Sequence, residues 1–237
     1  MLHGERYEGE LTTAYIRGKW PPRVQRCSSG SNSLDSLILN HGFGGVCQVY
    51  GPGSSGKSQM LFSSAAHYAV SGRRVLFVDT QGKFRPERVL EIAESISPDA
   101  RDPLSYIDVL STDSPERIEE EVKLRLRADN GYSAVMLDDL AEPYLRGGYS
   151  GRQTSSLSTT MRRLSVWSVI FGKHVLVTER VRYDFATRGQ RPVGIDFTCP
   201  YISCSLMFQR KDGNFVAKDL FSDRNAAFRV DKSGVRD

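Results

Sequence analysis

The stretch "GVCQVYGPGSSGKSQM" occupies residues 45–60 and joins three local patterns. Residues 45–51 form a short apolar run with β-branched side chains that ends at a glycine, which is typical of a buried strand. A glycine-rich loop follows. A helix is then expected over 56–71, because apolar side chains such as Met60 and Leu61 recur on one face. A strand, a glycine-rich loop and a helix in this order predict an α/β unit.

The loop "GPGSSGKS", residues 51–58, fits the pattern GxxxxGK[ST]. Its glycines allow backbone N–H groups to converge on phosphate oxygens, and the helix N-terminus adds partial positive charge. Lys57 is expected to reach the β- and γ-phosphates, and the Ser58 hydroxyl to bind Mg²⁺. A Gly/Ser-rich turn without a ligand is the alternative, but the flanking strand and helix favour a phosphate loop that binds ATP and Mg²⁺. The residues expected around the nucleotide are Gly51, Pro52, Gly53, Ser54, Ser55, Gly56, Lys57, Ser58 and Gln59.

Strand and helix patterns continue to alternate along the chain. Strands are expected at 73–80, 106–112, 132–139 and 174–181, and helices at 85–96, 114–126 and 154–172. Three more strand patterns follow Pro192. This order predicts an α/β fold with a mostly parallel central sheet, flanking helices and antiparallel C-terminal strands. Residues 1–30 are polar and contain "KWPPR", so they are expected to form an arm or linker before a core domain over 31–237.

A carboxylate for the metal is expected at the end of a buried strand. In "AVMLDD", residues 134–139, Asp138 ends an apolar run and Asp139 lies beside it. Asp138 is therefore expected to hold Mg²⁺ through water.

Composition sets limits on location and partners. The longest apolar run, 165–177, is interrupted by Lys173 and is shorter than the roughly 20 residues that span a bilayer. The N-terminus has no apolar core of a secretory signal, and the four cysteines lack metal-ligand spacing, so a reducing cell interior is expected. Residues 144–191 contain nine Arg or Lys residues and two acids, a local net charge of +7. This charge suits an anionic polymer, although a solvated face is the alternative.

Three further stretches carry a family resemblance: "VDTQGKFRPERV" (78–89), "VMLDDL" (135–140) and "VLVTERVR" (175–182). With the phosphate loop, they resemble in order and spacing the RecA-like recombinases, in particular the archaeal RadA and RadB type and their eukaryotic relatives. The resemblance covers about residues 11–237 and implies a RecA-like P-loop NTPase core. RadA-type recombinases carry a helix-hairpin-helix domain before this core, and no such domain is expected within residues 1–30. It therefore resembles the RadB-like paralogues, which implies an accessory recombination protein.

The chain departs from the family pattern at Gln81, where the resemblance implies a glutamate that polarises the attacking water. Glutamine can orient water but cannot accept its proton at neutral pH. Weak ATP hydrolysis is therefore expected. Hydrolysis supported by another acid, such as Asp139, is the alternative.

Two other departures concern the coupling of nucleotide state to DNA binding and the assembly of protomers. Glu179 and Arg180 stand where the family has amide side chains that sense the γ-phosphate. The family's phenylalanine-x-x-alanine tether, which docks on a neighbouring protomer, is matched by "LTTA", with Leu11 and Ala14. Leucine fills an apolar pocket less well than phenylalanine, at a cost on the order of 1 kcal/mol. Weaker self-association or docking on a RadA-type recombinase is expected, and a frayed arm is the alternative.

The family binds DNA through two loops, which match "YLRGGYSGRQ" (144–153) and "VRYDFATRGQRPVGIDF" (181–197). Flexible basic loops with aromatic residues suit single-stranded DNA, because arginines contact phosphates and rings stack on bases. The expected DNA-binding residues are Arg146, Arg152, Arg182, Arg188 and Arg191.

The leading hypothesis is an ATP-binding accessory protein of homologous recombination and DNA repair that binds single-stranded DNA or a recombinase filament and hydrolyses ATP slowly. Its expected location is the cytoplasm, at the nucleoid, with no membrane partner. One alternative is a competent DNA-dependent ATPase that exchanges strands itself. The other is a RecA-fold signalling ATPase that does not bind DNA.

Overall fold

The computed structural model describes residues 28–39, 45–127, 130–146, 148, 150–186, 188–211 and 213–237. The strands are β1 (Gly45–Tyr50), β2 (Arg74–Asp79), β3 (Ile107–Ser111), β4 (Tyr132–Asp138), β5 (His174–Glu179), β6 (Val181–Asp184), β7 (Gly189–Pro192), β8 (Ile202–Lys211), β9 (Asn214–Asp219), β10 (Asn225–Asp231) and β11 (Gly234–Arg236). The helices are α2 (Asn32–Leu39), α3 (Lys57–Val70), α4 (Pro86–Ile96), α5 (Pro115–Arg125), α6 (Glu142–Leu145), α7 (Gly151–Phe171) and α8 (Ile195–Thr198), with two short 3₁₀ turns at Pro103–Tyr106 and Cys199–Tyr201.

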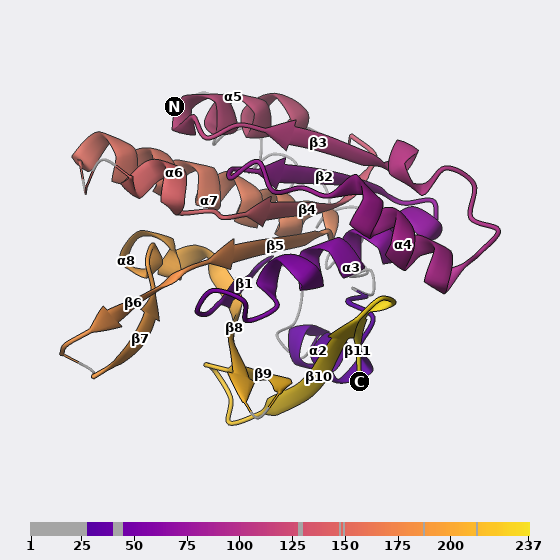
Figure 1. Ribbon diagram of the computed structural model, residues 1–237. Helices are drawn as coiled ribbons and strands as arrows, with labels where there is room; N and C mark the ends of the chain where they lie inside the picture. The colour runs from indigo at the N-terminus through magenta and orange to yellow at the C-terminus, as the bar shows by residue number, and fades with distance from the viewer. Residues whose placement is uncertain are drawn as a thin grey trace, which may run out of the picture.

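The central sheet has nine strands in the order β11-β10-β9-β8-β1-β5-β4-β2-β3 (Figure 1). From β8 to β3, neighbouring strands run parallel, and β8, β9, β10 and β11 form an antiparallel meander. This arrangement confirms the predicted fold class. It also places the carboxyl ends of β1, β2, β4 and β5 at one edge, where ligands of open parallel sheets bind.

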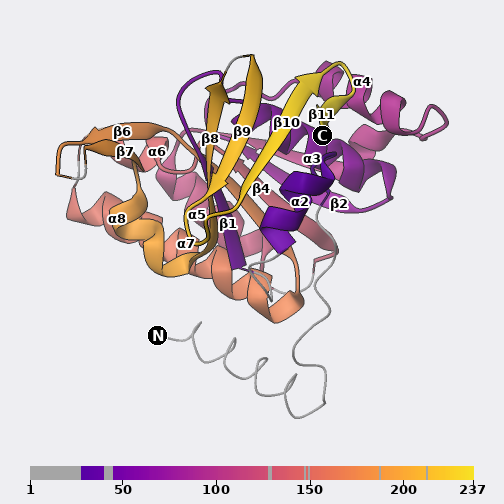
Figure 2. The same ribbon diagram turned by 90° about the horizontal axis from the view of Figure 1, so that it is seen from below.

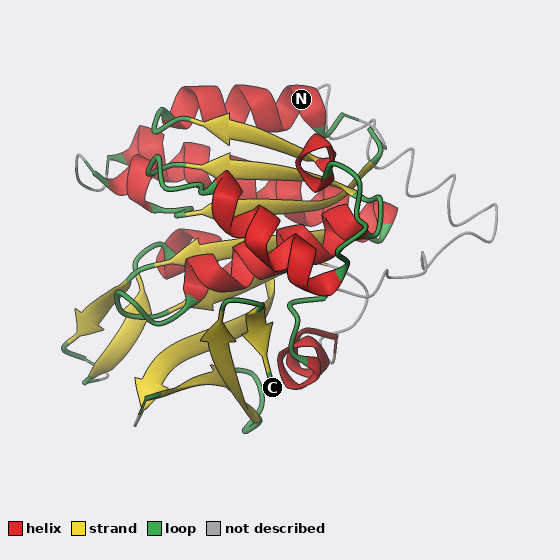
Figure 3. Ribbon diagram, turned by 45° about the vertical axis from the view of Figure 1, so that its right-hand side comes forward, coloured by secondary structure: helices red, strands yellow, loops and turns green. Residues whose placement is uncertain are grey.

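Helices cover both faces of the parallel part of the sheet (Figure 3). Successive residues of β2 point to opposite faces: Phe77 packs in the core with α3 and α4, whereas Leu76 and Val78 pack in the core with α5 and α7. Both cores exclude water, which explains why these strands appear in the sequence as continuous apolar runs. None of the described helices is both long and apolar enough to cross a bilayer.

The C-terminal strands close back on the first described helix. The Asp237 carboxylate accepts hydrogen bonds from the N–H groups of Asn32 and Ser33, at 3.0 and 3.1 Å, at the start of α2. The hydroxyls of Ser31 and Ser33 also donate to it, and these hydrogen bonds hold the pKa of Asp237 well below its usual range. Residue 237 thus caps α2, so the two ends of the described core support each other.

Two local predictions were wrong. Helix α7 begins at Gly151 rather than at 154, because the Ser150 hydroxyl caps it by accepting the N–H of Gln153. The segment predicted as a flexible second loop contains an antiparallel hairpin, β6–β7, that extends away from the sheet (Figures 1 and 2). The arginines predicted on flexible loops therefore lie mostly on ordered elements. Leu11 and Ala14, predicted to contact a partner, lie outside the described residues.

Candidate functional site

The glycine-rich loop connects the end of β1 to the start of α3. A Cβ atom at Gly51 would lie 2.2 Å from the Phe208 carbonyl oxygen, so only glycine fits beside β8 there. Gly56 has φ 93°, a left-handed conformation that favours glycine, and it immediately precedes the first turn of α3. A Cβ atom at Gly53 would meet nothing within 4 Å, so this part of the loop faces open space. The loop is therefore fixed at both ends and open to a ligand between them.

A cavity of about 410 Å³ lies beside this loop, at the carboxyl edge of the sheet. Its volume is within the range of small-ligand sites, roughly 300–1,000 Å³. The cavity is lined by Gly51, Pro52, Gly53, Ser54, Lys57, Ser58, Gln81, Lys83, Asp138, Asp139, Arg180 and Val181. Most of the residues predicted around a nucleotide, from strands and turns far apart in the sequence, thus meet in one cavity.

Lys57 is the first residue of α3 and lies along the loop. Its Nζ atom donates hydrogen bonds to the carbonyl oxygens of Gly51 and Pro52, both at 2.8 Å. Burial lowers the pKa of Lys57, and the carboxylates of Asp139 and Asp138 oppose this shift. The loop and these two acids together hold the ammonium group beside the cavity.

Asp138 is the last residue of β4, where the sequence predicted the metal-side carboxylate. Its Oδ1 atom accepts a hydrogen bond from the Thr178 hydroxyl on β5, and it lines the same cavity as Ser58. A hydroxyl and a carboxylate fit Mg²⁺, which keeps several waters and takes further ligands from phosphates. No group of three potential metal-ligating His, Cys, Asp or Glu side chains occurs in the described part of the chain.

Gln81 lies on the turn after β2. The buried Asp79 carboxylate accepts the N–H groups of Gln81 and Phe84, at 3.1 and 2.8 Å, and so shapes this turn. The Gln81 amide nitrogen lies 3.5 Å from Asp139 Oδ2 and 3.3 Å from Glu142 Oε2, and its amide oxygen accepts from Lys83 Nζ at 2.6 Å. Both ends of this amide are thus engaged by neighbouring side chains.

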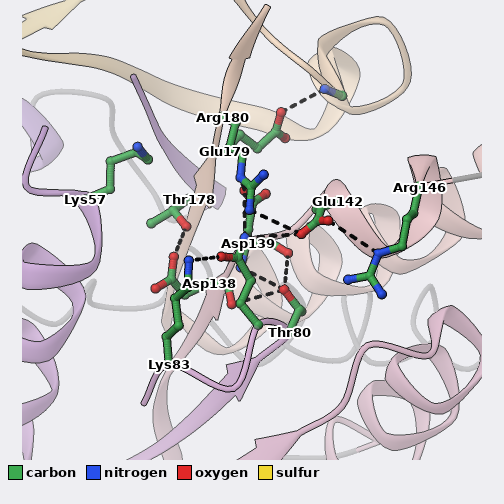
Figure 4. A network of polar contacts seen from close by, with 12 residues as sticks. Lys57, Thr80, Lys83, Asp138, Asp139, Glu142, Arg146, Thr178, Glu179 and Arg180 are labelled. Carbon is green, nitrogen blue, oxygen red and sulfur yellow. Dashed lines mark hydrogen bonds and ion pairs between the residues drawn. The ribbon is translucent and has the colours of Figure 1, made fainter. Parts of the chain in front are cut away.

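Asp139 is the centre of a polar network that joins the cavity to α6 (Figure 4). Its Oδ2 atom lies 3.3 Å from Arg180 Nε, and Arg180 also reaches Glu142 at 3.5 Å. Burial, reinforced by the charge of Asp138, raises the pKa of Asp139 to about 7, while Arg180 opposes the rise. This carboxyl group therefore changes its protonation state near neutral pH.

Glu179 ends β5 and is fully buried. Its Oε2 atom accepts the N–H of Gly194 at 2.9 Å, and the N–H of Val193 donates to the Arg180 carbonyl at 3.1 Å. These two hydrogen bonds close the base of the β6–β7 hairpin. Burial raises the pKa of Glu179 to about 7; the Gly194 N–H and the Gln48 amide lower it, and the Asp139 charge raises it further.

The first pair of predicted DNA-binding arginines lies at the end of α6 and the start of α7. Arg146 follows α6 and pairs with Asp113 at 2.7 Å and with Glu142 at 3.4 Å. Arg152 is exposed in the first turn of α7, beside Glu116. Ser150 followed by Gln153 was a capping signal in the sequence that marks this helix start.

The other three predicted arginines lie on the hairpin. Arg182 on β6 pairs with Asp196, and Arg191 on β7 lies 3.3 Å from both Asp184 and Asp196. Arg188 is exposed at the turn. Tyr183 and Phe185 are 55% and 86% exposed, with ring centroids 5.1 Å apart. The hairpin thus presents charge and aromatic surface together.

Two cationic residues of the cavity were not predicted to bind the nucleotide. Lys83 and Arg180 both line the cavity. Each stands inside a stretch that the sequence had already singled out, "VDTQGKFRPERV" and "VLVTERVR". The available signal was a basic residue inside each of these stretches.

A glycine loop between β1 and α3, facing Asp138 on a nearby parallel strand, defines a RecA-like core. The chain matches the family model described as Rad51 over residues 22–237, and it therefore belongs to the Rad51 family. It is 32% identical over 173 residues to the DNA repair and recombination protein RadB of Thermococcus kodakarensis, an alignment that covers 70% of this chain and 75% of that protein.

It is also 23% identical to the DNA repair and recombination protein RadA of Methanococcus maripaludis, over 90% of this chain and 76% of that protein. Among solved structures, the crystal structure of the RadB recombinase superposes with a TM-score of 0.71 and 26% identity. That superposition covers 89% of this chain and 99% of the solved one. The resemblance to RadB-type recombinases is thereby confirmed.

Proposed function

We propose that this protein is an accessory protein of homologous recombination and DNA repair that binds ATP and Mg²⁺, contacts single-stranded DNA or a recombinase filament, and hydrolyses ATP slowly. Relatives named as DNA repair and recombination proteins support a role in recombination and repair. One structural observation supports the proposal: the glycine loop, Lys57, Asp138 and Gln81 line one cavity. The resemblance implies a glutamate at the position of Gln81. Action in the cytoplasm belongs to this proposal.

The residues have separate roles in this proposal. The loop N–H groups and Lys57 bind the phosphates, because charge-assisted hydrogen bonds are the strong ones. Ser58 and Asp138 would hold Mg²⁺, which neutralises phosphate charge when bound. Gln81 lacks a basic site, and its amide oxygen already accepts from Lys83. Docking of Leu11 and Ala14 on a partner stays a prediction.

ATP binding is expected to weaken 10- to 100-fold in Lys57→Ala, since a charged hydrogen-bond donor to phosphate contributes about 1.5–3 kcal/mol. Fluorescence anisotropy of a labelled ATP with Mg²⁺ measures the affinity. The exposed Lys218→Ala on β9 removes the same charge elsewhere and serves as the control. Equal affinities of wild type and Lys57→Ala would contradict the assignment of the loop, and a wild type that binds no nucleotide would end the proposal.

Slow turnover is expected in the wild type, with a rise of at least about tenfold in Gln81→Glu, because a general base contributes roughly 10²–10⁴ in rate. The glutamate carboxylate can accept a proton from the attacking water, which the glutamine amide cannot do. Phosphate release with and without single-stranded DNA measures turnover, and Gln81→Ala controls for loss of the amide. Rapid turnover in the wild type would show instead that another acid, such as Asp139, accepts the proton.

A further inference from the structure

Three cations from three separate elements line the nucleotide cavity: Lys57 on α3, Lys83 on the turn after β2, and Arg180 between β5 and β6 (Figure 4). Lys57 is bound to the loop carbonyls. Lys83 and Arg180 are outside the loop and belong to no part of the GxxxxGK[ST] pattern. The cavity thus contains two cations that binding by the loop does not use.

Neither cation is held firmly by its present partners. Lys83 donates to the Gln81 amide, which is neutral and leaves the ammonium charge uncompensated. Arg180 is 54% exposed, and its contacts with Asp139 and Glu142 are long, at 3.3 and 3.5 Å. Long contacts of a half-exposed arginine contribute little, whereas a phosphate group forms charge-assisted bonds to both kinds of cation.

The identity of residue 81 is what leaves Lys83 available. With Nζ only 2.6 Å from the side-chain oxygen, a carboxylate at position 81 would neutralise Lys83 as an ion pair. Glutamine keeps the turn hydrogen-bonded without adding negative charge. Three cations then line the cavity together with two carboxylates, Asp138 and Asp139, while Glu142 contacts Arg180 from outside the lining. The excess of positive charge at the cavity surface favours an additional anion.

From this arrangement we infer that Lys83 and Arg180 together bind the terminal phosphate, so that the protein distinguishes a nucleoside triphosphate from a diphosphate with two cations of its own chain. The inference rests on the proposed nucleotide binding. Lys57 and the loop bind both nucleotides, and the cation pair adds affinity only where a third phosphate is present. Lys83 and Arg180 are therefore specificity-determining residues.

The test compares ATP and ADP, each with Mg²⁺, as competitors of a labelled nucleotide on the full chain. Lys83→Ala and Arg180→Ala are each expected to weaken ATP roughly tenfold, the effect of losing one charge-assisted bond, and the double variant more. ADP affinity is expected to change less than about twofold, so the ATP-to-ADP preference falls. Gln81→Glu is expected to lower the same preference by pairing with Lys83. Lys218→Ala is again the control.

Equal weakening of ATP and ADP in both variants would show a general charge effect and overturn the inference, as would an unchanged ATP-to-ADP ratio. Thermal unfolding of each variant checks that the fold is kept; Arg180→Gln and Lys83→Gln replace any alanine variant that does not fold. If the wild type bound neither nucleotide, the proposed function would fail first and the inference with it. Binding of both without the expected selectivity overturns the inference alone.

Discussion

Glu179→Gln is expected to raise the melting temperature at pH 8 by roughly 6–12 °C while leaving it nearly unchanged at pH 4. The reason is the burial of this carboxyl group at the base of the β6–β7 hairpin, which raises its pKa from the ordinary 4.5 to about 7. That difference corresponds to about 3 kcal/mol between the two protonation states. Glutamine has the same shape and keeps an oxygen for the Gly194 N–H, but it cannot become charged.

The direction of the effect follows from the raised pKa. Below pH 4.5 the group is protonated in the folded and the unfolded chain, so its full contribution to stability is present. Between pH 4.5 and about 7 the folded chain keeps a proton that the unfolded chain releases, and stability falls as the pH rises. Above pH 7 the wild type must hold a buried charge that Glu179→Gln lacks. Differential scanning fluorimetry from pH 4 to 9 measures both curves.

A matched control is Glu94→Gln, which removes the same charge from an exposed position on α4. Its melting curve is expected to run parallel to that of the wild type at every pH. Asp139 also has a pKa near 7 and remains in all three proteins, so the difference between the curves reports Glu179 together with its interaction with the Asp139 charge. If the Glu179→Gln curve also ran parallel to the wild type, the buried charge would have no effect on stability.

The sequence was sufficient to predict the sheet and the central part of the site. Lys57 and Ser58 begin the helix that follows the loop after β1, and Asp138 ends β4. The carboxyl ends of parallel strands meet at one edge of a sheet, so local patterns determined that these residues lie close together. The apolar runs that became β1, β2, β4 and β5 are buried on both faces and need no alternation to be identified.

The hairpin was missed for a different reason. Strands β6 and β7 pair with each other and with no strand of the main sheet, so burial imposes no alternation of apolar and polar residues on them. The role of Glu179 was missed because it depends on Gly194, 15 residues away, and on burial that only tertiary packing produces. A charged residue in a strand end gives no sign in the sequence of whether it will be exposed.

Two of the arginines predicted to bind DNA must exchange a carboxylate partner for a phosphate when they bind it. Arg182 and Arg191 are already paired with Asp184 and Asp196 in the free protein. These pairs are partly exposed, and such pairs typically contribute about 0–1 kcal/mol, so DNA phosphates can replace the carboxylates at small cost. A hydrogen-bonded hairpin also loses less conformational entropy on binding than an unstructured loop would. Pairing within the hairpin therefore orients the arginines without preventing their contact with phosphates.

Replacing Arg182, Arg188 and Arg191 by alanine is expected to weaken binding of a labelled oligothymidine by at least about 100-fold at 50 mM salt, because three phosphate contacts are lost. The slope of log affinity against log salt is expected to become shallower by about 2, since each contact with a single strand contributes about 0.7. Phe185→Ala, at an 86% exposed position, is expected to weaken binding without changing that slope, because stacking releases no counterions.

The matched control replaces three exposed arginines away from the hairpin, Arg101, Arg127 and Arg224, and so removes the same total charge. It is expected to keep most of the affinity and the salt slope of the wild type. If the control lost as much affinity as the hairpin variant, net charge rather than the hairpin would attract the DNA. Unchanged binding in the hairpin variant would instead indicate that Arg146 and Arg152 make the DNA contacts. Absence of binding in the wild type would favour a RecA-fold ATPase that acts without DNA.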